Sequence, residues 1–447
     1  MPYLVFCRGG IFSSGKNLSD NATNNTYSAE DSRAASDTWE NHAATSFAGG
    51  TGAENDPWLI SSAEELAYLA KTCNNGEMYS GKYFKQTADI YLGGYDWVPI
   101  GKSEGNGSFK AVYDGNYFSI YNMYMADIDS SRESVGLFGR TGVSVIKNVS
   151  IKQSVIDATG INYVGAFVGF SDARSTFENC KVEANIIGDT GVGGIAGISW
   201  NSKFINCKFS GSITAQTYAG GIVGQVLASN VGGNNQFVES CINLGNITAV
   251  SHYAGGIVGQ YGPAASAYPA PRLANCYNNG IIKGFADVGG IAGEAGNSEV
   301  MNCMSEGVVD GTDIVGGLIG QTHEDTTVRD CMSKSYIIIH TANTAGGIVG
   351  QFRGKLENCC FIGGSNLFTA GNFYGGKYDN NATITSCYAI MNRVKGYSSK
   401  GDFSGFAVSA DFNDGYPVQK SLYHVANFMP QATRAWFAEQ GYGSVKE

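Results

Sequence analysis

Apolar residues in this chain occur in short runs that are separated by glycines and polar residues at a regular interval. The clearest run is a five-residue phrase of two glycines, two apolar residues and another glycine. The phrase begins at Gly193, Gly220, Gly255, Gly289, Gly316 and Gly346, and weaker copies lie near Gly136, Gly165 and Gly375. Self-similarity at an interval of roughly 28 residues is the signature of a repeat architecture, in which each unit buries its apolar side against its neighbours.

Each repeat holds two further short apolar segments. One ends in Asn-Cys, as in 204–207, and the next follows a glycine, as in 211–214. Three short strands in each unit describe one coil of a parallel β-helix, and no window of ten or more residues in the repeats has the 3.6-residue periodicity of a helix. We therefore predict an all-β fold, a right-handed parallel β-helix (β-solenoid) with about 28 residues per three-strand coil.

The segments outside the repeats divide the chain into four parts. Residues 1–36 are predicted to be a flexible N-terminal arm, because they are rich in Asn, Ser, Asp and Ala. Residues 37–130 form an N-terminal cap with the first coils, including a helix from the capping box at Ser62 to about Cys73. The repeats occupy 131–390. Residues 391–447 contain a closing strand near 414–418 and a C-terminal cap with helical spacing over 425–440.

Composition and charge narrow the classes of function. The 447 residues include 62 Gly but only 8 Pro, and the formal net charge is −10 without any basic block, which argues against a nucleic-acid partner. There is no apolar run long enough to cross a membrane as a helix. Residues 1–8 lack the cationic start of a secretory leader.

Cysteine usage follows the repeat rather than a disulfide framework. One cysteine occupies the same place in successive coils, and we predict a ladder of small, buried, apolar side chains with neighbours about 4.8 Å apart. No Cys-x-x-Cys pair is present, so no metal and no cofactor are expected. The asparagine before most of these cysteines is predicted to sit at a corner and to hydrogen-bond along the stack. The ladder cysteines are Cys180, Cys207, Cys241, Cys276, Cys303, Cys331, Cys359 and Cys387.

The glycine phrase followed by Asn-Cys at this spacing resembles the GLUG motif of bacterial surface proteins. Residues 47–66 and 82–101 are similar to the entry segment of such proteins, so the resemblance covers roughly 45–418. It implies an exported or surface β-solenoid, often adhesin-like. The motif also accompanies some IgA-cleaving metallopeptidases, whose chemistry needs His-Glu-x-x-His. Here His323-Glu324 is followed by Asp-Thr-Thr, so that activity is not implied.

Two neighbouring repeats depart from the common spacing. The distance from the glycine phrase to the next cysteine is 14 residues from Gly193 to Cys207, but 21 from Gly220 to Cys241 and from Gly255 to Cys276. The extra residues lie at about Val226–Gln236 and Tyr261–Arg272, and we expect them to project side by side. Loops on a rigid scaffold are common locations for binding sites.

Aromatic and polar side chains gather at the same point in neighbouring coils. Aromatic rings beside polar groups suit sugar rings, although solvated corner residues and tolerated insertions explain the same pattern. Glu294 and Glu324 lie one coil apart, which leaves open a pair of catalytic carboxylates as in retaining glycosidases. Tyr163, Tyr218 and Tyr253 precede their glycine phrases, either as an exposed aromatic ladder or as strand packing. The candidate ligand-binding residues are Trp200, Asn234, Tyr261, Tyr268, Arg272, Glu294, His323 and Glu324.

These observations favour a non-enzymatic, extracellular or cell-surface β-solenoid, adhesin-like or glycan-binding, whose partner is a host or environmental glycan or a surface protein. One alternative is a carbohydrate-active enzyme, a polysaccharide lyase or glycoside hydrolase, on the same scaffold. Another is a self-assembling subunit of a surface filament that associates through the N-terminal arm or the solenoid ends. No transmembrane segment is expected.

Overall fold

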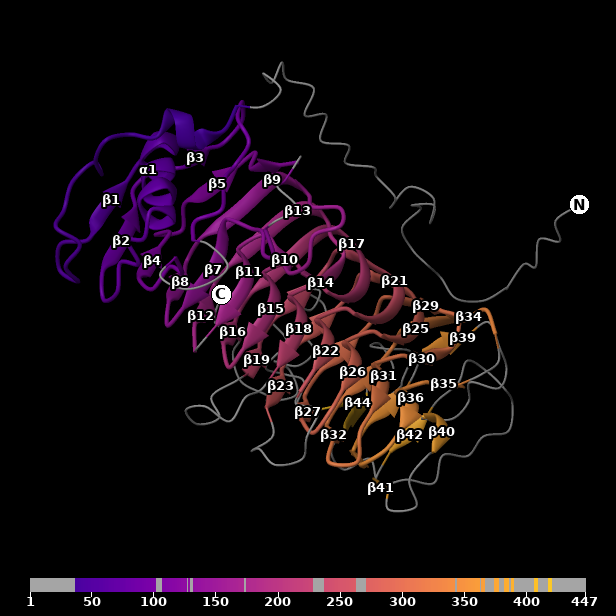
Figure 1. Cartoon of the computed structure of the whole chain (residues 1–447). Coiled ribbons are helices and arrows are strands. Elements are labelled where there is room, and N and C mark those ends of the chain that lie inside the picture. Colours follow the sequence, from indigo (N-terminus) through magenta and orange to yellow (C-terminus); the bar gives the residue numbers. More distant parts are fainter. Residues whose placement is uncertain are drawn as a thin grey trace, which may run out of the picture.

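The chain forms a stack of coils whose strands build three parallel sheets (Figure 1). The computed structural model describes residues 37–389 except 102–106, 127, 129–131, 173, 228–236, 263–270, 342–343, 362, 366–373, 378–381 and 386, together with 406–408 and 417–419. The predicted parallel β-solenoid is confirmed. The flexible arm predicted for 1–36 and the helical segment predicted for 425–440 lie outside the described residues.

The first sheet has twelve strands and runs the length of the stack. Its strands are β1 (Trp58–Ile60), β2 (Tyr83–Gln86), β4 (Val112–Asp114), β8 (Val145–Lys147), β12 (Thr176–Glu178), β16 (Lys203–Ile205), β19 (Phe237–Glu239), β23 (Arg272–Ala274), β27 (Glu299–Met301), β32 (Thr327–Arg329), β37 (Lys355–Glu357) and β41 (Thr383–Thr385). Each pairs in parallel with the next, so one strand of this sheet marks each coil.

The second sheet has 21 strands, because most coils enter it in two or three pieces. They are β3 (Ile90–Tyr91), β5 (Ser119–Tyr121), β6 (Tyr124–Met125), β9 (Ser150–Asp157), β10 (Val164–Gly165), β13 (Lys181–Ile187), β14 (Thr190–Gly193), β17 (Lys208–Gly220), β20 (Ile242–Asn243), β21 (Asn246–Gly255), β24 (Tyr277–Asn278), β25 (Ile281–Gly289), β28 (Met304–Ser305), β29 (Val308–Gly311), β30 (Ile314–Gly316), β33 (Met332–Ser333), β34 (Tyr336–Ile339), β35 (Thr344–Gly346), β38 (Cys360–Phe361), β39 (Gly364–Ser365) and β42 (Tyr388–Ala389).

The third sheet has nine strands and follows the glycine phrase in each coil. They are β7 (Phe138–Gly142), β11 (Val168–Asp172), β15 (Ala196–Trp200), β18 (Val223–Leu227), β22 (Val258–Tyr261), β26 (Ala292–Ala295), β31 (Ile319–Thr322), β36 (Val349–Phe352) and β40 (Tyr374–Lys377). Separately, β43 (Phe406–Val408) pairs antiparallel with β44 (Pro417–Gln419), which overlaps the predicted closing strand.

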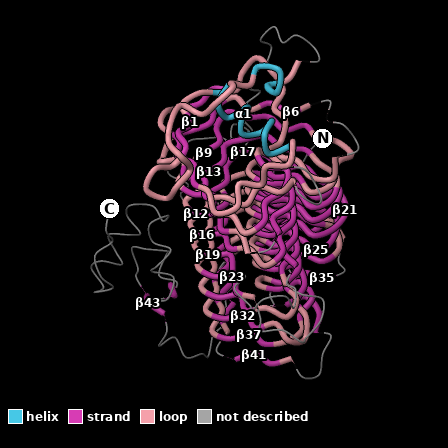
Figure 2. The backbone as a smooth tube through the Cα atoms, turned by 60° about the vertical axis from the view of Figure 1, so that its left-hand side comes forward, coloured by secondary structure: helices cyan, strands magenta, loops and turns pink. Residues whose placement is uncertain are grey.

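Helical structure lies at the N-terminal end of the stack (Figure 2). The 3-10 helix η1 covers Trp39–His42, and α1 covers Ala63–Asn74. Ser62 accepts a hydrogen bond from the amide of Glu65, as the capping box predicts. Leu66, Leu69, Ala70 and Cys73 are buried, so the helix packs its apolar side onto the first coils. The strand predicted over 83–92 is two strands, β2 and β3, interrupted after Gln86.

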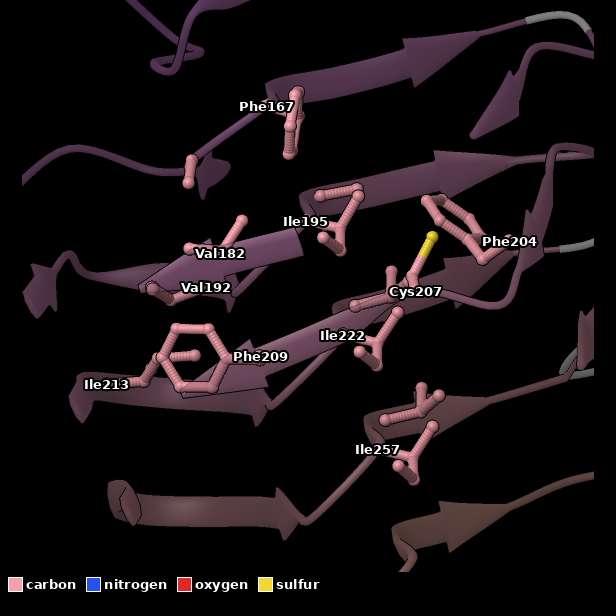
Figure 3. Close-up of a cluster of buried hydrophobic side chains, with 14 of the residues drawn as sticks. Phe167, Val182, Val192, Ile195, Phe204, Cys207, Phe209, Ile213, Ile222 and Ile257 are labelled. Atoms are coloured by element: carbon pink, nitrogen blue, oxygen red, sulfur yellow. The ribbon is translucent and has the colours of Figure 1, made fainter. Parts of the chain in front are cut away.

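The core runs through the centre of the coils as columns of like residues. Figure 3 shows Ile195, Ile222 and Ile257, the first apolar residue of three successive glycine phrases, pointing inward one beneath another. All three are fully buried. Phe177 and Phe204 form another column, with ring centroids 5.1 Å apart and planes 5° apart. Stacking identical side chains in register lets each coil bury its apolar side against the next.

The predicted cysteine ladder is also confirmed. The ladder cysteines are unpaired and buried, except Cys387 near the last described coil, which is half-buried. The Cys207 thiol donates to the Phe177 carbonyl of the preceding coil, at 3.5 Å. A cysteine that fills a small apolar space and donates its thiol hydrogen bond to a backbone carbonyl serves to pack the core.

The residue before each ladder cysteine from Cys180 to Cys359, together with Asn148 at the same place in the preceding coil, forms what we call the asparagine corner, between the first and second sheets. Asn206 donates from Nδ2 to Oδ1 of Asn179 at 2.6 Å, and Asn179 donates likewise to Asn148 at 2.9 Å. All eight corner residues have φ between 51° and 57°, a left-handed conformation that asparagine tolerates best among residues with a side chain. They are Asn148, Asn179, Asn206, Ser240, Asn275, Asn302, Asp330 and Asn358.

The register confirms where the two long coils depart from the rest. Phe204 pairs with Val238 and Val238 with Leu273, which are 34 and 35 positions apart, whereas Leu273 and Val300 are 27 apart. The additional residues lie between β18 and β19 and between β22 and β23. Most of both inserts, 228–236 and 263–270, is outside the described residues, so their predicted side-by-side projection stays a prediction.

Candidate functional site

The glycine phrase makes the tightest turn of each coil, between the second and third sheets, and we call it the glycine corner. A Cβ atom on Gly220 would lie 2.0 Å from the carbonyl oxygen of Val223. One on Gly224 would lie 2.4 Å from the amide nitrogen of Val192 in the preceding coil. Backbone therefore packs directly on backbone here, and only the residues flanking the phrase carry side chains outward.

Two columns of side chains flank the glycine corner. The tyrosine column holds the residue two positions before the phrase, namely Tyr163, Gly191, Tyr218, Tyr253 and Asp287. The amide column holds the residue directly after the last glycine, namely Arg140, Phe170, Ile198, Gln225, Gln260, Glu294, Gln321 and Gln351. The rings of Tyr163 and Phe170 meet at 5.8 Å, which places the two columns side by side.

The tyrosine column adopts a left-handed backbone. Tyr163, Tyr218 and Tyr253 have φ of 52°, 56° and 66°, and Asp287 has φ of 55°. The Tyr218 and Tyr253 rings stack with centroids 4.9 Å apart and planes 1° apart. A left-handed tyrosine costs about 1–2 kcal/mol relative to a residue in the ordinary regions. The rings are half-buried, so this ladder is neither fully exposed nor part of the core.

The amide column is a hydrogen-bonded chain across four coils. Gln225 donates from Nε2 to Oε1 of Gln260 at 2.6 Å, and Gln260 donates from Nε2 to Oε2 of Glu294 at 3.2 Å. The other carboxylate oxygen of Glu294 lies 2.7 Å from Nε2 of His323 in the next coil. The chain therefore begins with amides and ends in a carboxylate and an imidazole.

Towards the N-terminal end of the solenoid, the side chains beside the glycine corner are aromatic. The guanidinium of Arg140 lies over the Phe170 ring, 4.4 Å from its centroid, and bonds Asp172 at 3.1 Å. Phe170 in turn packs edge-on against Trp200, with centroids 5.4 Å apart. Trp200 keeps 39% of its surface exposed, so a large apolar ring is held rigidly at the surface.

The carboxyl groups at the far end of the surface are unusually buried. Asp287 is 4% exposed and Glu294 is 8% exposed. Burial raises the pKa of Asp287 to about 7, and the negative charges of Glu294 and Asp313 act in the same direction while His323 opposes them. Burial also raises the pKa of Tyr253, again with Glu294 contributing. The surface thus ends in an acidic cluster whose protonation changes near neutral pH.

Three of the candidates predicted from the sequence, Trp200, Glu294 and His323, follow the glycine corner. Glu294 and His323 are in contact, whereas Trp200 on β15 lies three strands away from Glu294 on β26. Glu324 is exposed in the turn after β31, and the register pairs Glu294 with Gln321, so the expected pair of Glu294 and Glu324 is not opposed across neighbouring strands. Asn234 and Tyr268 lie outside the described residues.

Two of the candidates lie elsewhere. Tyr261 was expected in an insert, but it belongs to β22, and its ring is fully buried because alternation along the strand turns Gln260 outward and Tyr261 inward. Arg272 is on the first sheet, where it bonds Glu239 at 2.9 Å. Neither residue flanks the glycine corner.

Asp287 was missed in the sequence. The signal was present, because it occupies the place of Tyr218 and Tyr253 two residues before the phrase. Nothing in its sequence neighbourhood discloses the burial that perturbs its pKa. In the described part of the chain, no group of three or more His, Cys, Asp or Glu side chains is arranged to hold a metal ion. None of the described helices has the length and apolarity needed to cross a membrane.

The family model described as the GLUG motif matches residues 188–214, which form one coil of this parallel solenoid. Halomucin of Haloquadratum walsbyi is 29% identical over 163 residues, which are 34% of this chain and 2% of halomucin. A protein of Evansella cellulosilytica named "Putative Gly-rich membrane protein" is 30% identical over 147 residues, 31% of this chain and 16% of that protein. The matched segment is thus a small part of both relatives.

One solved structure aligns with most of this chain. It is described as "a putative immunoglobulin A1 protease from Bacteroides ovatus". The alignment covers 84% of this chain and 95% of that chain, with 19% sequence identity and a TM-score of 0.42.

Proposed function

We propose that this chain is a non-enzymatic module of an extracellular or cell-surface protein, adhesin-like, that binds glycans along the glycine corner. The observation that carries the proposal is the exposed Trp200 ring, held by Phe170 and Arg140, on the same surface as the amide column. Aromatic faces stack on sugar rings, and the adjacent amides supply donors and acceptors for hydroxyl groups. The names of the two relatives agree with a surface location without specifying a ligand.

Regular spacing strengthens this proposal. The amide column repeats once in each coil, at about 4.8 Å along the axis. A polymer that lies along the stack meets a glutamine or glutamate side chain in each coil from Gln225 to Gln351, which favours an extended chain over a compact small molecule. Host or environmental polysaccharides and glycoproteins fit this description.

The test is glycan-array binding of the intact chain and two variants. Trp200→Ala is expected to abolish most binding, by about tenfold or more, since one stacked aromatic typically contributes 1–3 kcal/mol. Tyr336→Ala is the matched control, because Tyr336 is an aromatic with 47% exposure on the second sheet, away from the glycine corner. Binding that survives Trp200→Ala unchanged would contradict the proposed surface.

A carbohydrate-active enzyme is the second candidate, and the pKa of Asp287 favours it. A protonated carboxyl near an ionised one is the arrangement that glycoside hydrolases use, with the protonated group as the acid. The expected result under this alternative is release of reducing or unsaturated ends from a polysaccharide, and its loss in Glu294→Gln. No release from any polysaccharide that the array identifies would exclude the alternative.

A further inference from the structure

The first sheet holds an aromatic ring between two cationic side chains. Lys203 on β16, Phe237 on β19 and Arg272 on β23 are direct partners in the register of three neighbouring strands (Figure 1). The Lys203 ammonium lies over the Phe237 ring, 5.1 Å from its centroid, and the Arg272 guanidinium lies 6.0 Å from the same centroid. We call these three residues the cationic cluster.

The cationic cluster is open to solvent. The side chain of Arg272 is 44% exposed, and Lys203 and Phe237 are half-buried. All three stand on the outward side of their strands, because alternation turns the following residue of each strand into the core. A ligand can therefore reach both cations without any separation of the coils.

The positive charge of the cluster is only partly neutralised. Arg272 bonds Glu239 at 2.9 Å through Nη2, and Glu239 also accepts from Asn275 at 3.3 Å. Within the part of the chain that the structure describes, Lys203 has no carboxylate at ion-pairing distance. The inserts 228–236 and 263–270, which precede two of these strands, contain no Asp or Glu that could supply one.

Other cations of the first sheet are held by carboxylates. Lys147 lies 3.4 Å from Asp114, and Arg329 lies 2.8 Å from Glu299. These pairs are complete within the chain, as expected of charges that only cover a surface. Lys203 has a phenyl ring in place of a carboxylate, so its charge remains available to a ligand.

The ring holds the two cations in position. Cation–π contacts at exposed sites contribute about 0.5–1 kcal/mol, and here they restrict the rotamers of two long side chains. An anion that binds these side chains therefore loses less conformational entropy than it would in ordering two free ones. The register keeps the cations in one row along the solenoid axis, two strand spacings or about 9–10 Å apart.

Two positive charges in one row along the axis fit an extended polyanion. A carboxylate can bond the Arg272 guanidinium, whose N–H groups bind carboxylates in pairs, while another carboxylate of the same polymer reaches the Lys203 ammonium. A small anion with one charge meets only one of the two cations. Because the whole chain carries a net charge of −10, attraction of a polyanion must come from a local cluster.

We propose that Lys203, Phe237 and Arg272 form a second binding site, for an extended polysaccharide that carries uronic-acid carboxylates. The site lies on the first sheet, apart from the glycine corner, and the strands that follow both inserts contribute to it. One carboxylate bonds Arg272 and another bonds Lys203. The choice of a polysaccharide as the carrier of these carboxylates rests on the glycan-binding function proposed above.

The experiment compares ligands that differ in charge alone. Isothermal titration calorimetry of the full chain uses an octamer of galacturonate and the same octamer with every carboxylate methyl-esterified. We expect the acidic octamer to bind more tightly than the ester, with an affinity that falls as the salt concentration rises. The double variant Lys203→Met, Arg272→Gln is expected to weaken the acidic octamer on the order of tenfold, because both charged contacts are lost.

Lys355→Met is the matched control. Lys355 stands in the same row of the first sheet as Lys203 and is exposed, but its register partners are Thr327 and Thr383 rather than an aromatic residue. This variant should leave the affinity unchanged. Phe237→Leu keeps both charges and removes the ring, and we expect a smaller loss of about threefold. Circular dichroism verifies that each variant retains the β-solenoid.

The outcomes separate this site from the glycine corner. If the double variant alone weakens the acidic octamer, the uronate site stands whatever Trp200→Ala does to other glycans. If Trp200→Ala abolishes binding of the acidic octamer and the double variant does not, the glycan-binding function stands and the uronate site is overturned.

Three further results would overturn the uronate site. One is equal binding of the acidic octamer and its ester, or no binding of either. Another is an equal loss in Lys355→Met, which would indicate a general effect of surface charge. The third is an octamer of glutamate that binds as tightly through the same two cations, which would make the polysaccharide assignment wrong.

Discussion

The asparagine corner and the glycine corner solve the same geometrical problem with different residues. Both place residues of several successive coils in a left-handed backbone. The asparagine corner fills the position with residues that tolerate it, and their side chains bond one another along the stack. The glycine corner fills it with Gly191 and Asp287, which tolerate it, and with Tyr163, Tyr218 and Tyr253, for which the conformation is costly and whose rings are half-buried.

This difference agrees with the binding role proposed for the glycine corner. A corner whose only role is to turn the chain is expected to contain residues that adopt the left-handed backbone at the lowest free-energy cost. Strained residues persist where the surrounding structure fixes them and where their side chains have another use. The comparison therefore directs attention to the glycine corner, and it can be tested by altering each corner in turn.

The largest effect is expected from placing a side chain inside the glycine corner. Gly224→Ala puts a Cβ 2.4 Å from the Val192 amide nitrogen, and no flexible side chain can move away to make room. We expect a loss of roughly 4–5 kcal/mol in the free energy of unfolding, or failure to fold. Urea denaturation followed by circular dichroism measures it.

Gly142→Ala is the matched control, because Gly142 lies in the same nine-stranded sheet and its nearest contacts to an added Cβ are 3.6 Å away. It should stay within about 1 kcal/mol of wild type. Equal losses in the two variants would mean that the glycine corner is no tighter than the rest of the sheet.

The second largest effect concerns the pH dependence of stability at Asp287. Its folded-state pKa of about 7 lies above the unfolded-state value near 3.8, so the folded state binds the proton more tightly. The stability that protonated Asp287 contributes is complete below about pH 4 and is lost as the pH rises toward 7. Asp287→Asn should thus be nearly neutral at pH 4 and more stable than wild type at pH 8, by at most roughly 4 kcal/mol.

Melting temperatures of the wild type and Asp287→Asn across pH 4–8 test this expectation. Asp310→Asn is the control, because it alters a carboxylate that pairs with His340 and Lys283 on the second sheet, and it should show no growing advantage with pH. A constant difference in melting temperature between wild type and Asp287→Asn across the whole range would refute the raised pKa of Asp287.

A smaller effect is expected at the asparagine corner. Asn206→Ala removes the 2.6 Å bond to Asn179 and places alanine at φ 52°. The expected loss is about 1–2 kcal/mol in the free energy of unfolding. Asn206→Gly removes the same bond but permits the backbone conformation, so it should recover about half of the loss. If glycine and alanine are equivalent, the left-handed backbone contributes nothing to the choice of asparagine.

The smallest effect is expected for the tyrosine column. Tyr218→Gly loses the stack on Tyr253 but relieves the backbone at φ 56°, and the two terms nearly cancel, each being about 1 kcal/mol. Tyr218→Ala loses the stack without relief and should be less stable than Tyr218→Gly by about 1 kcal/mol. The order of stability of the two variants is measured from their unfolding midpoints. If Tyr218→Ala were the more stable variant, the left-handed backbone at Tyr218 would not be strained.

The sequence predicted the β-solenoid well because each coil has the same requirements for backbone contact, corner conformation and core packing. The glycine phrase at Gly193 or Gly220 is required by backbone contact, and Asn206 and Cys207 are required by the corner and the interior, so these features recur and are visible. The candidate site is visible only in part. Trp200, Glu294 and His323 were found by counting from the phrase.

The sequence analysis misplaced residues whose location depends on side-chain direction or on strand register, because it relied on spacing along the chain. Counting assigned Tyr261 to an insert, but strand alternation beside the outward Gln260 turns it into the core. Counting also matched Glu294 with Glu324, whereas the strand register matches it with Gln321. The groups that act on Asp287 come from its own coil and from the next one, where Asp313 and His323 lie, and no short stretch of sequence contains that information.

The in-register pairing of the twelve-stranded sheet has a consequence for how such chains change length. Residues 180–206 make up one coil, and excising them would join Asn179 directly to Cys207, which restores the Asn-Cys pair and keeps both ladders continuous. Duplication or loss of a single repeat during recombination would therefore leave a foldable product, longer or shorter by about 4.8 Å. The length of the solenoid can then vary among descendants in discrete steps, independently of the acidic cluster several coils away.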